Sequence, residues 1–263
     1  MKRAVIWGVN QYCNFPEAEL RGARNDSTAM AAFAEIELGI AHQDVTLLMD
    51  RLATRGAIWE ALERAVRDSR WGDYLFIWRS SHGTQIPDLD GDERDGYDEA
   101  SVVYDSAEVS GEWDRKTLIV DDDLRTLFAR LPDGVLVEMG SDTCYSETGL
   151  KRLGQTYDRA RLLVLPRGYK DPPKRHKRLG LAVPYSNLIH WAACAENDTS
   201  ADAHIEGMWQ GAGTWAFRME YRPEDSRGDL IFRMKKRLRD NHFGQVPALE
   251  CLGTLARGAV GAR

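Results

Sequence analysis

The sequence contains no long apolar run. No stretch of the 263-residue chain approaches the roughly 20 apolar residues that a bilayer-spanning helix needs. The first residues, Met-Lys-Arg-Ala-Val-Ile-Trp-Gly-Val, pair two basic residues with a short apolar segment, but this segment ends at Val9 and no small-residue cleavage site follows. We therefore expect a buried first strand, no membrane partner and a cytoplasmic protein.

Cysteine is scarce, and no two cysteines lie close together in the sequence. The four are Cys13, Cys144, Cys194 and Cys251. This spacing excludes zinc sites of the Cys-x-x-Cys type. Scattered cysteines in a cytoplasmic chain are usually reduced and buried, so the useful question is whether one of the four has a chemical role.

The chain also lacks an excess of positive charge. Its formal net charge is -6, whereas phosphate binding needs a clustered basic surface. We therefore predict no nucleic-acid partner. A hydrophobic content of 43% and a charged content of 29% are typical of a soluble globular protein, and the length suits one large α/β domain.

Strand-like and helix-like segments alternate along the chain. The pattern predicts strands over residues 3–9, 45–49, 74–78, 135–139, 187–194 and 248–252. It predicts helices over residues 26–37, 54–69 and 121–131, and near 212–220 and 227–239. Asp26 and Thr54 are the expected N-caps of the first two helices. This alternation indicates a mainly parallel central sheet with helices on both faces.

Two segments interrupt the alternation. Residues 84–100 are rich in acidic residues and are expected to form a long loop. Residues 170–178 are basic and contain two prolines. Such a stretch cannot bury itself, so we expect an exposed connector there.

Two chemically active side chains directly follow two predicted strands. His82 comes after the third strand and Cys144 after the fourth, and functional groups of parallel sheets collect beyond the carboxyl ends of the strands. A histidine before glycine is commonly a turn residue, and a cysteine after a strand commonly belongs to the core. Together, however, an imidazole can take the thiol proton and deliver it to a leaving amine. The N–H groups of Gly83 and Cys144 are candidates for an oxyanion hole.

Around these residues the sequence resembles cysteine peptidases of the caspase/metacaspase type and their prokaryotic, orthocaspase-like relatives. Ser80-Ser81-His82-Gly83 resembles the family's Ser-Gly-His-Gly motif, and Asp142-Thr143-Cys144-Tyr145-Ser146 resembles its Asp-x-Cys-His-Ser motif. Further similar segments are Leu20–Asp26, 84–93, 95–99, 193–201, 211–214 and 245–251. The resemblance covers residues from about 3 to about 254, with departures from the usual residues at Ser81, Tyr145 and Glu147.

The resemblance implies a caspase-hemoglobinase-like fold. It divides a single domain into a large-subunit-like catalytic region (1–169), an exposed basic connector (170–185) and a small-subunit-like region (186–263). It implies a thiol protease with Cys144 as nucleophile and His82 as its acid/base partner. Caspases dimerise through an edge strand whereas metacaspases are generally monomeric, so we expect a monomer.

The resemblance also implies a substrate pocket. It places Asp26 and Asp142 in the pocket for the side chain before the scissile bond, with Ser80 lining it. Two carboxylates favour a guanidinium, so we expect protein or peptide substrates with Arg or Lys at that position. The plainer alternatives are a helix cap for Asp26 and a turn residue for Asp142.

Calcium is a further question that the acidic residues raise. Asp88-Leu89-Asp90-Gly91-Asp92 does not match an EF-hand, because Glu93 occupies the position of the required glycine. Some metacaspases bind an activating calcium, and the matching positions here are Asp98, Asp121, Asp122 and Lys151. A lysine among three aspartates can neutralise them without a metal, so we predict that neither calcium nor another cofactor is required.

The basic connector is a candidate processing site. An enzyme that cuts after Arg or Lys can cut itself between residues 174 and 178, an upstream activating protease can cut there, or the loop can remain intact. Two other functions remain open. The departures at 81, 145 and 147 motivate a catalytically impaired, caspase-like binding or regulatory module, against which the intact Cys144 and His82 argue. The same sheet can also carry a cysteine hydrolase for another type of bond, although the acidic pocket pair argues for peptide substrates.

Overall fold

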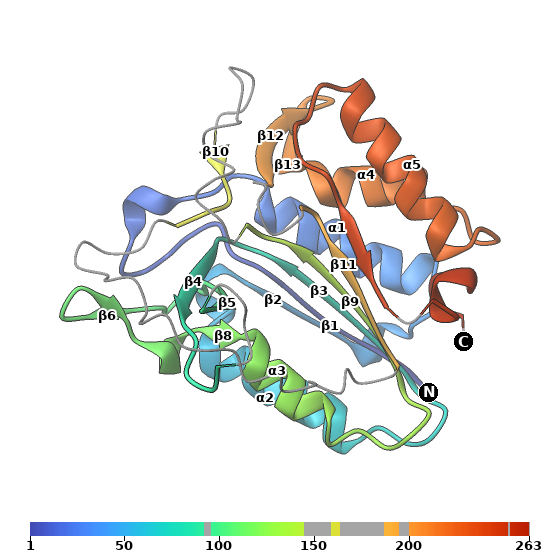
Figure 1. Ribbon diagram of the computed structural model, residues 1–263, viewed down its shortest axis with the longest axis horizontal. Helices are drawn as coiled ribbons and strands as arrows, with labels where there is room; N and C mark the ends of the chain where they lie inside the picture. The colour runs from blue at the N-terminus through green and yellow to red at the C-terminus, as the bar shows by residue number, and fades with distance from the viewer. Residues whose placement is uncertain (92–95, 145–158, 164–186, 195–199, 252, 263) are drawn as a thin grey trace.

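A six-stranded, mainly parallel sheet forms the centre of the molecule (Figure 1). A computed structural model of the chain describes residues 1–91, 96–144, 159–163, 187–194, 200–251 and 253–262. The strand order is β14-β11-β9-β3-β1-β2, and only β14 runs antiparallel to its neighbour. The strands are β1 (Lys2–Gly8), β2 (Val45–Met49), β3 (Tyr74–Ser80), β9 (Leu136–Asp142), β11 (Leu188–Ala192) and β14 (Ala248–Glu250). The predicted α/β sheet is confirmed.

Helices cover both faces of this sheet (Figure 1). One face carries α1 (Ala23–Ile36), α4 (Ala212–Glu220) and α5 (Arg227–Asp240), and the other carries α2 (Arg55–Arg67) and α3 (Asp121–Phe128). Successive side chains of a strand point to opposite faces. Accordingly, Val5 and Trp7 of β1 belong to the core beneath α2 and α3, whereas Ala4 and Ile6 belong to the core beneath α1, α4 and α5. Burial on both faces explains why these strands read as continuous apolar runs.

The prediction of a loop over residues 84–100 is wrong at both ends, where the chain forms strands. β4 (Gly83–Pro87) pairs antiparallel with β5 (Tyr97–Ser101), and β5 pairs with β8 (Ile119–Val120). Ile86 and Ala100 are buried in the core and hold this hairpin against it. The acidic composition of the tip concealed two short strands. The remaining small sheets contain β10 (Arg159–Ala160), β12 (Ala201–Ile205) and β13 (Met208–Gly211), and β6 (Glu108–Val109) and β7 (Glu112–Trp113).

The two predicted helix caps differ in outcome. Thr54 precedes α2, and its hydroxyl accepts a hydrogen bond from the N–H of Ala57 at 3.2 Å, as expected of an N-cap. Asp26 is not a cap, because α1 begins at Ala23 and Asp26 lies within the first turn. Its carboxylate is buried and accepts hydrogen bonds from elsewhere in the fold.

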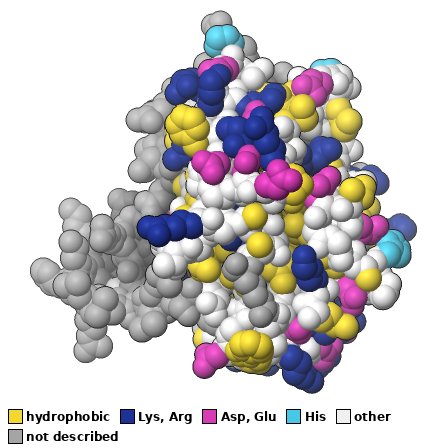
Figure 2. Space-filling model, turned by 90° about the vertical axis from the view of Figure 1, so that its right-hand side faces the viewer, with side chains coloured by type: hydrophobic (Ala, Val, Ile, Leu, Met, Phe, Trp, Pro, Cys, Tyr) yellow, Lys and Arg dark blue, Asp and Glu magenta, His cyan; other side chains and the backbone are white. Residues whose placement is uncertain are grey.

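On the surface, basic side chains lie beside acidic ones. Figure 2 shows one face on which Lys and Arg are interspersed with Asp, Glu and apolar side chains. On the strongly basic helix α5, Arg237 lies 2.5 Å from Glu220 and Lys236 pairs with Asp240. Such pairing reduces the positive potential that nucleic-acid binding requires. Within the described residues, no helix has the length and apolar character needed to cross a membrane.

Candidate active site

His82 and Cys144 follow neighbouring strands of the sheet. β3 and β9 are paired in parallel, and Ser80 lies opposite Asp142 at the carboxyl end of the pair. His82 and Cys144 each lie two positions beyond these paired residues, and both side chains are buried. The topology therefore brings both residues to the same edge of the sheet.

The environment of His82 fixes its tautomer. Its Nε2 lies 2.7 Å from the carbonyl oxygen of Ala18, so this nitrogen carries the proton. Nδ1 is buried and has no hydrogen-bond partner among the described residues. The backbone N–H of His82 donates to the hydroxyl of Tyr12 at 2.9 Å, and the two rings pack with centroids 5.2 Å apart. Burial lowers the pKa of His82 to about 4, which leaves a neutral imidazole with a free lone pair at neutral pH.

Cys144 contacts the backbone of Ser200. Its Sγ lies 2.5 Å from the N–H nitrogen of Ser200 and 3.2 Å from the carbonyl oxygen. In this structure the thiol therefore bonds to Ser200, whereas Nδ1 of His82 is unpaired. Catalytic hydrogen bonds frequently form only when substrate binds. The thiol of Cys194 lies beside Cys144, and this contact together with burial raises the pKa of Cys194.

An arginine of the chain itself fills an acidic pocket beside these residues. The guanidinium Nη2 of Arg161 lies 2.6 Å from Asp26 Oδ2 and 2.9 Å from Asp202 Oδ1. Its Nη1 donates to the carbonyl oxygen of Asp142 at 3.1 Å and lies 3.6 Å from the carboxylate of the same residue. Nη1 also donates to the hydroxyl of Ser80. All five side chains are buried, so the pocket holds a guanidinium between three carboxylates.

The pocket carboxylates are themselves held in place. Asp142 accepts hydrogen bonds from the N–H and the hydroxyl of Thr214 at 2.7 and 2.6 Å. Asp26 accepts one from the N–H of Gly211 at 2.9 Å. Burial, reinforced by the nearby charge of Asp142, raises the pKa of Asp26 to about 6, although the guanidinium of Arg161 opposes the shift. The charge of Asp26 is therefore expected to change near pH 6.

Glycines form part of the pocket wall. A Cβ at Gly211 would lie 2.2 Å from Asp142 Oδ2, and a Cβ at Gly22 would lie 2.5 Å from Asp202 Oδ1. Both distances are shorter than any non-bonded contact to a carbon atom. The carboxylates can therefore approach the guanidinium only because these positions lack a side chain.

The backbone of Arg161 lies across the predicted oxyanion hole. Its carbonyl oxygen accepts hydrogen bonds from the N–H of Gly83 at 2.9 Å and from the N–H of Cys144 at 3.2 Å. Its own N–H donates to the carbonyl of Ser200 at 3.1 Å. Two N–H groups directed at one carbonyl oxygen are the arrangement that polarises an acyl group for nucleophilic attack.

Sequence patterns did not reveal several of these residues. Asp202 is the one charged residue among the apolar and small residues at the start of β12, and that contrast was an available signal. Tyr12 contributes a hydroxyl, and Ala18 acts through a backbone carbonyl that any residue type provides. Ser200 contributes backbone groups and also a hydroxyl that donates to Asp142 at 2.5 Å. The presence of Arg161 in the pocket depends on tertiary structure.

The aspartates considered for calcium lie close to arginines. Asp98 Oδ2 accepts a hydrogen bond from Arg115 at 2.5 Å, and Asp122 lies 3.7 Å from Arg115 and 3.1 Å from Arg125. Burial raises the pKa of Asp98 to about 7. Buried Oδ1 atoms of Asp98 and Asp121 have no hydrogen-bond partner in the described part of the chain. That part contains no group of three His, Cys, Asp or Glu placed to hold a metal.

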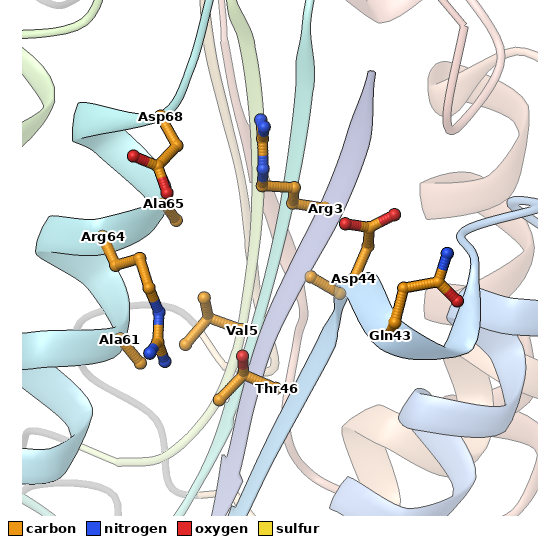
Figure 3. Close-up of a pocket in the computed structure, with 10 residues that line it drawn as sticks. Arg3, Val5, Gln43, Asp44, Thr46, Ala61, Arg64, Ala65 and Asp68 are labelled. Carbon is orange, nitrogen blue, oxygen red and sulfur yellow. The ribbon is translucent and has the colours of Figure 1, made fainter.

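A separate hollow lies at the β2 edge of the sheet (Figure 3). The hollow is lined by Arg3 and Val5 of β1, Thr46 of β2, Arg64 of α2 and Asp68, which directly follows α2. It contains none of the residues predicted for catalysis or substrate binding. Tyr145, Glu147, Lys151 and the connector 170–185 lie outside the described residues, so the expectations about them stay predictions.

Comparison with known proteins places this geometry in a family. Residues 2–152 match the family model of the metacaspase, peptidase C14 domain. The chain is 28% identical to Metacaspase-1B of Aspergillus oryzae, over 95% of this chain and 67% of that protein. It is also 28% identical to Metacaspase-1 of Coccidioides immitis, over 95% of this chain and 61% of that protein.

Two solved structures share the fold. A crystal structure of a Geobacter sulfurreducens protein superposes with a TM-score of 0.74 at 24% identity, covering 99% of this chain and 98% of that one. Caspase-1 of Spodoptera frugiperda superposes with a TM-score of 0.62 at 13% identity, covering 95% of this chain and 88% of that one. The predicted caspase-like fold is confirmed.

Proposed function

The chain belongs to the metacaspase family of cysteine-type endopeptidases, and on that premise we propose that it cuts proteins after Arg or Lys. In this proposal Cys144 is the nucleophile and His82 its acid/base partner. Gly83 and Cys144 supply the oxyanion hole, and Asp26, Ser80, Asp142 and Asp202 bind the basic side chain.

The position of Arg161 carries the proposal. A buried guanidinium contacts the carboxylates of Asp26 and Asp202, while the carbonyl of the same residue accepts from Gly83 and Cys144. Specificity and catalysis both require one residue to satisfy these two sets of contacts at once. An aspartate in the same pocket would bring a fourth carboxylate into a buried site, and its charge would be opposed.

The proposed chemistry uses a neutral imidazole. His82 holds its Nε2 proton on Ala18, which leaves Nδ1 to take the proton of the thiol. The thiolate of Cys144 attacks the carbonyl carbon, and the two N–H groups stabilise the negative oxygen that forms. The imidazolium then protonates the leaving amine, and water hydrolyses the thioester.

A panel of four peptide reporters tests the proposal. The peptides carry Arg, Lys, Asp or Ala before a reporter amide, and the wild type is compared with Cys144→Ala. We expect hydrolysis after Arg and Lys only, and none with the variant. Hydrolysis after Asp contradicts the pocket assignment. Absence of all hydrolysis, even after limited nicking near residues 174–178, favours the alternative of a catalytically impaired binding or regulatory module.

We further propose that calcium is not required. Arg115 already places a cation between Asp98 and Asp122, and an aspartate with a pKa near 7 is a weak ligand for a cation that takes six to eight oxygens. Full activity in excess chelator is the expected result. Activity that is lost in chelator and restored by calcium contradicts it.

The remaining expectations are also proposals. The enzyme acts as a cytoplasmic monomer, and its connector is cut between residues 174 and 178 by itself or by an upstream protease. Fragment masses of wild type and Cys144→Ala separate the two routes, because the variant stays intact if processing is self-inflicted.

A further inference from the structure

We propose that Cys144 and Cys194 form a reversible disulfide when a hydroperoxide reaches the active site, and that this disulfide switches the peptidase off. The inference rests on the proposed function, because Cys144 is the nucleophile in both. It gives a role to a second cysteine that the proposed catalytic steps leave unused. The co-reactant is a small hydroperoxide, such as hydrogen peroxide.

The central sheet brings the two cysteines to the same edge. β9 and β11 are paired in parallel with Ser141 opposite Ala192, and beyond this pair the N–H of Ala193 donates to the carbonyl of Ser141 at 2.9 Å. Cys144 follows Ser141 by three positions and Cys194 follows Ala192 by two. Neighbouring strands lie about 4.8 Å apart, and disulfides join Cα atoms about 4.4–6.8 Å apart. The backbone spacing at this edge therefore suits a disulfide.

The side chains of the two cysteines are held together. Cys144 and Cys194 form one buried cluster with Leu162, and their exposed fractions are 0% and 6%. Sγ of Cys194 also donates to the carbonyl oxygen of Thr143, the residue before Cys144, at 3.4 Å. We therefore expect bond formation to need rotation of the side chains rather than movement of a strand.

The surroundings give the two sulfur atoms different roles. In the proposed mechanism His82 takes the proton of Cys144, and the thiolate that results is the form that a hydroperoxide oxidises. The hydrogen bond with Cys144, reinforced by burial, raises the pKa of Cys194, so Cys194 keeps its proton and acts as the resolving thiol. A peptide carbonyl has to reach Cys144 during catalysis, so a smaller hydroperoxide can reach it as well.

The oxidation proceeds in two balanced steps. The thiolate of Cys144 attacks one oxygen of hydrogen peroxide, the O–O bond breaks, and the leaving hydroxide takes the proton held on His82 and becomes water. Cys144 is then a sulfenic acid. Sγ of Cys194 attacks that sulfur, the S–OH bond breaks, and the hydroxide takes the thiol proton of Cys194 to form a second water. The peroxide thus removes two electrons from the two thiols, and a dithiol returns them by exchange.

The disulfide affects the enzyme in two ways. Its formation stops hydrolysis, because the sulfur of Cys144 cannot attack a peptide carbonyl while it is bonded to Cys194. It also removes the sulfenic acid before further peroxide converts it to sulfinic acid, a product that thiols do not reduce. Cys194 therefore makes the loss of activity reversible.

The test treats the purified full-length wild type and Cys194→Ser with hydrogen peroxide and then with dithiothreitol. Non-reducing peptide mapping by mass spectrometry identifies each oxidised cysteine, and an Arg reporter measures activity relative to each untreated protein. In the wild type we expect a linked peptide pair that contains Cys144 and Cys194, and dithiothreitol should separate the pair and restore the activity. In Cys194→Ser we expect Cys144 to gain two or three oxygen atoms and the activity to stay lost.

Cys251→Ala is the matched control. Cys251 packs against the core beneath α1, α4 and α5, so its removal should leave both the disulfide and the recovery as in the wild type. The hydroxyl introduced by Cys194→Ser can donate to Thr143 as the thiol does, and circular dichroism checks that the variant folds. The disulfide map of the wild type decides the case if it does not.

The outcomes separate this inference from the proposed function. Oxidation of wild-type Cys144 to sulfinic acid without a disulfide overturns the inference, and so does a disulfide that joins Cys144 to Cys13 or Cys251. Equal recovery of the wild type and Cys194→Ser shows that the two cysteines only pack together, as buried cysteines commonly do, and overturns it too. In each of these cases reporter hydrolysis before oxidation leaves the proposed function intact. A Cys144–Cys194 disulfide in a chain that hydrolyses no reporter supports the oxidation site and contradicts the proposed function.

Discussion

Acid should switch off the substrate pocket before it affects the catalytic histidine. The pKa of Asp26 is raised to about 6, and that of His82 is lowered to about 4. As pH falls through 6, Asp26 takes up a proton and loses the charge that binds a guanidinium. His82 stays neutral until the pH approaches 4. We therefore expect kcat/KM for an Arg peptide to fall along an acid limb near pH 6.

The size of the effect follows from the contacts. A charge-assisted hydrogen bond, as between Asp26 and Arg161 at 2.6 Å, contributes about 1.5–3 kcal/mol. Its loss lowers kcat/KM by roughly 10- to 150-fold, at about 1.4 kcal/mol per factor of ten. At pH 5 only roughly a tenth of Asp26 remains ionised for a pKa of about 6, so activity should lie about tenfold below its plateau. When Arg161 leaves the pocket, loss of its guanidinium raises the pKa of Asp26, whereas the water that enters lowers it. The two changes oppose each other, so the limb is expected to stay near pH 6.

The assay is a pH profile of kcat/KM between pH 4 and 9 on the processed enzyme, with Asp26→Asn as the matched variant. The variant should lose roughly 10- to 150-fold of its plateau activity and also the limb near pH 6. A wild-type limb found only near pH 4 refutes the reasoning. If Asp26→Asn still shows an acid limb near pH 6, another group titrates there, and the assignment of the limb to Asp26 is wrong.

Two further substitutions test the packing. Glu138 is buried and forms an ion pair with Arg227 at 2.9 Å. Glu138→Ala leaves the buried charge of Arg227 unpaired and should lower the free energy of unfolding by about 3–5 kcal/mol. Urea denaturation should therefore show a lower midpoint, and an unchanged midpoint contradicts this expectation. Gly211→Ala places a Cβ 2.2 Å from the carboxylate of Asp142. Overpacking should lower the free energy of unfolding by about 1–3 kcal/mol, and displacement of Asp142 should lower kcat/KM for Arg peptides. The control Gly56→Ala has no atom within 4 Å of its new Cβ and should keep full activity.

The central sheet could be predicted from sequence because its strands are buried on both faces. Val45–Met49 has the predicted bounds of β2, and Thr54 caps α2 as expected. The start of α1 was missed because Asp26 has the residue type of a cap, yet its carboxylate accepts from Ser80 and Gly211. The strands β4 and β5 were missed because acidic residues dominate the segment between them.

Only those residues of the functional site whose side-chain type and local motif are distinctive could be predicted from the sequence. His82 and Cys144 stand out because each follows a strand within a recognisable motif. Tyr12 and Ser200 do not, since a lone tyrosine and a lone serine resemble many others in the sequence. Arg161 could not be identified at all, because nothing local distinguishes it from the other arginines of the chain.

Labelling of the nucleophile tests whether Cys144 reacts beside an acidic pocket. The probe is a peptide that ends in Arg and carries an electrophilic ketone, with a matched peptide that ends in Asp, and mass spectrometry locates the adduct on the processed enzyme. We expect one adduct, on Cys144, formed much faster with Arg than with Asp and strongly slowed in His82→Ala. Modification of the exposed Cys13 in preference to Cys144, or equal rates with Arg and Asp, would contradict it.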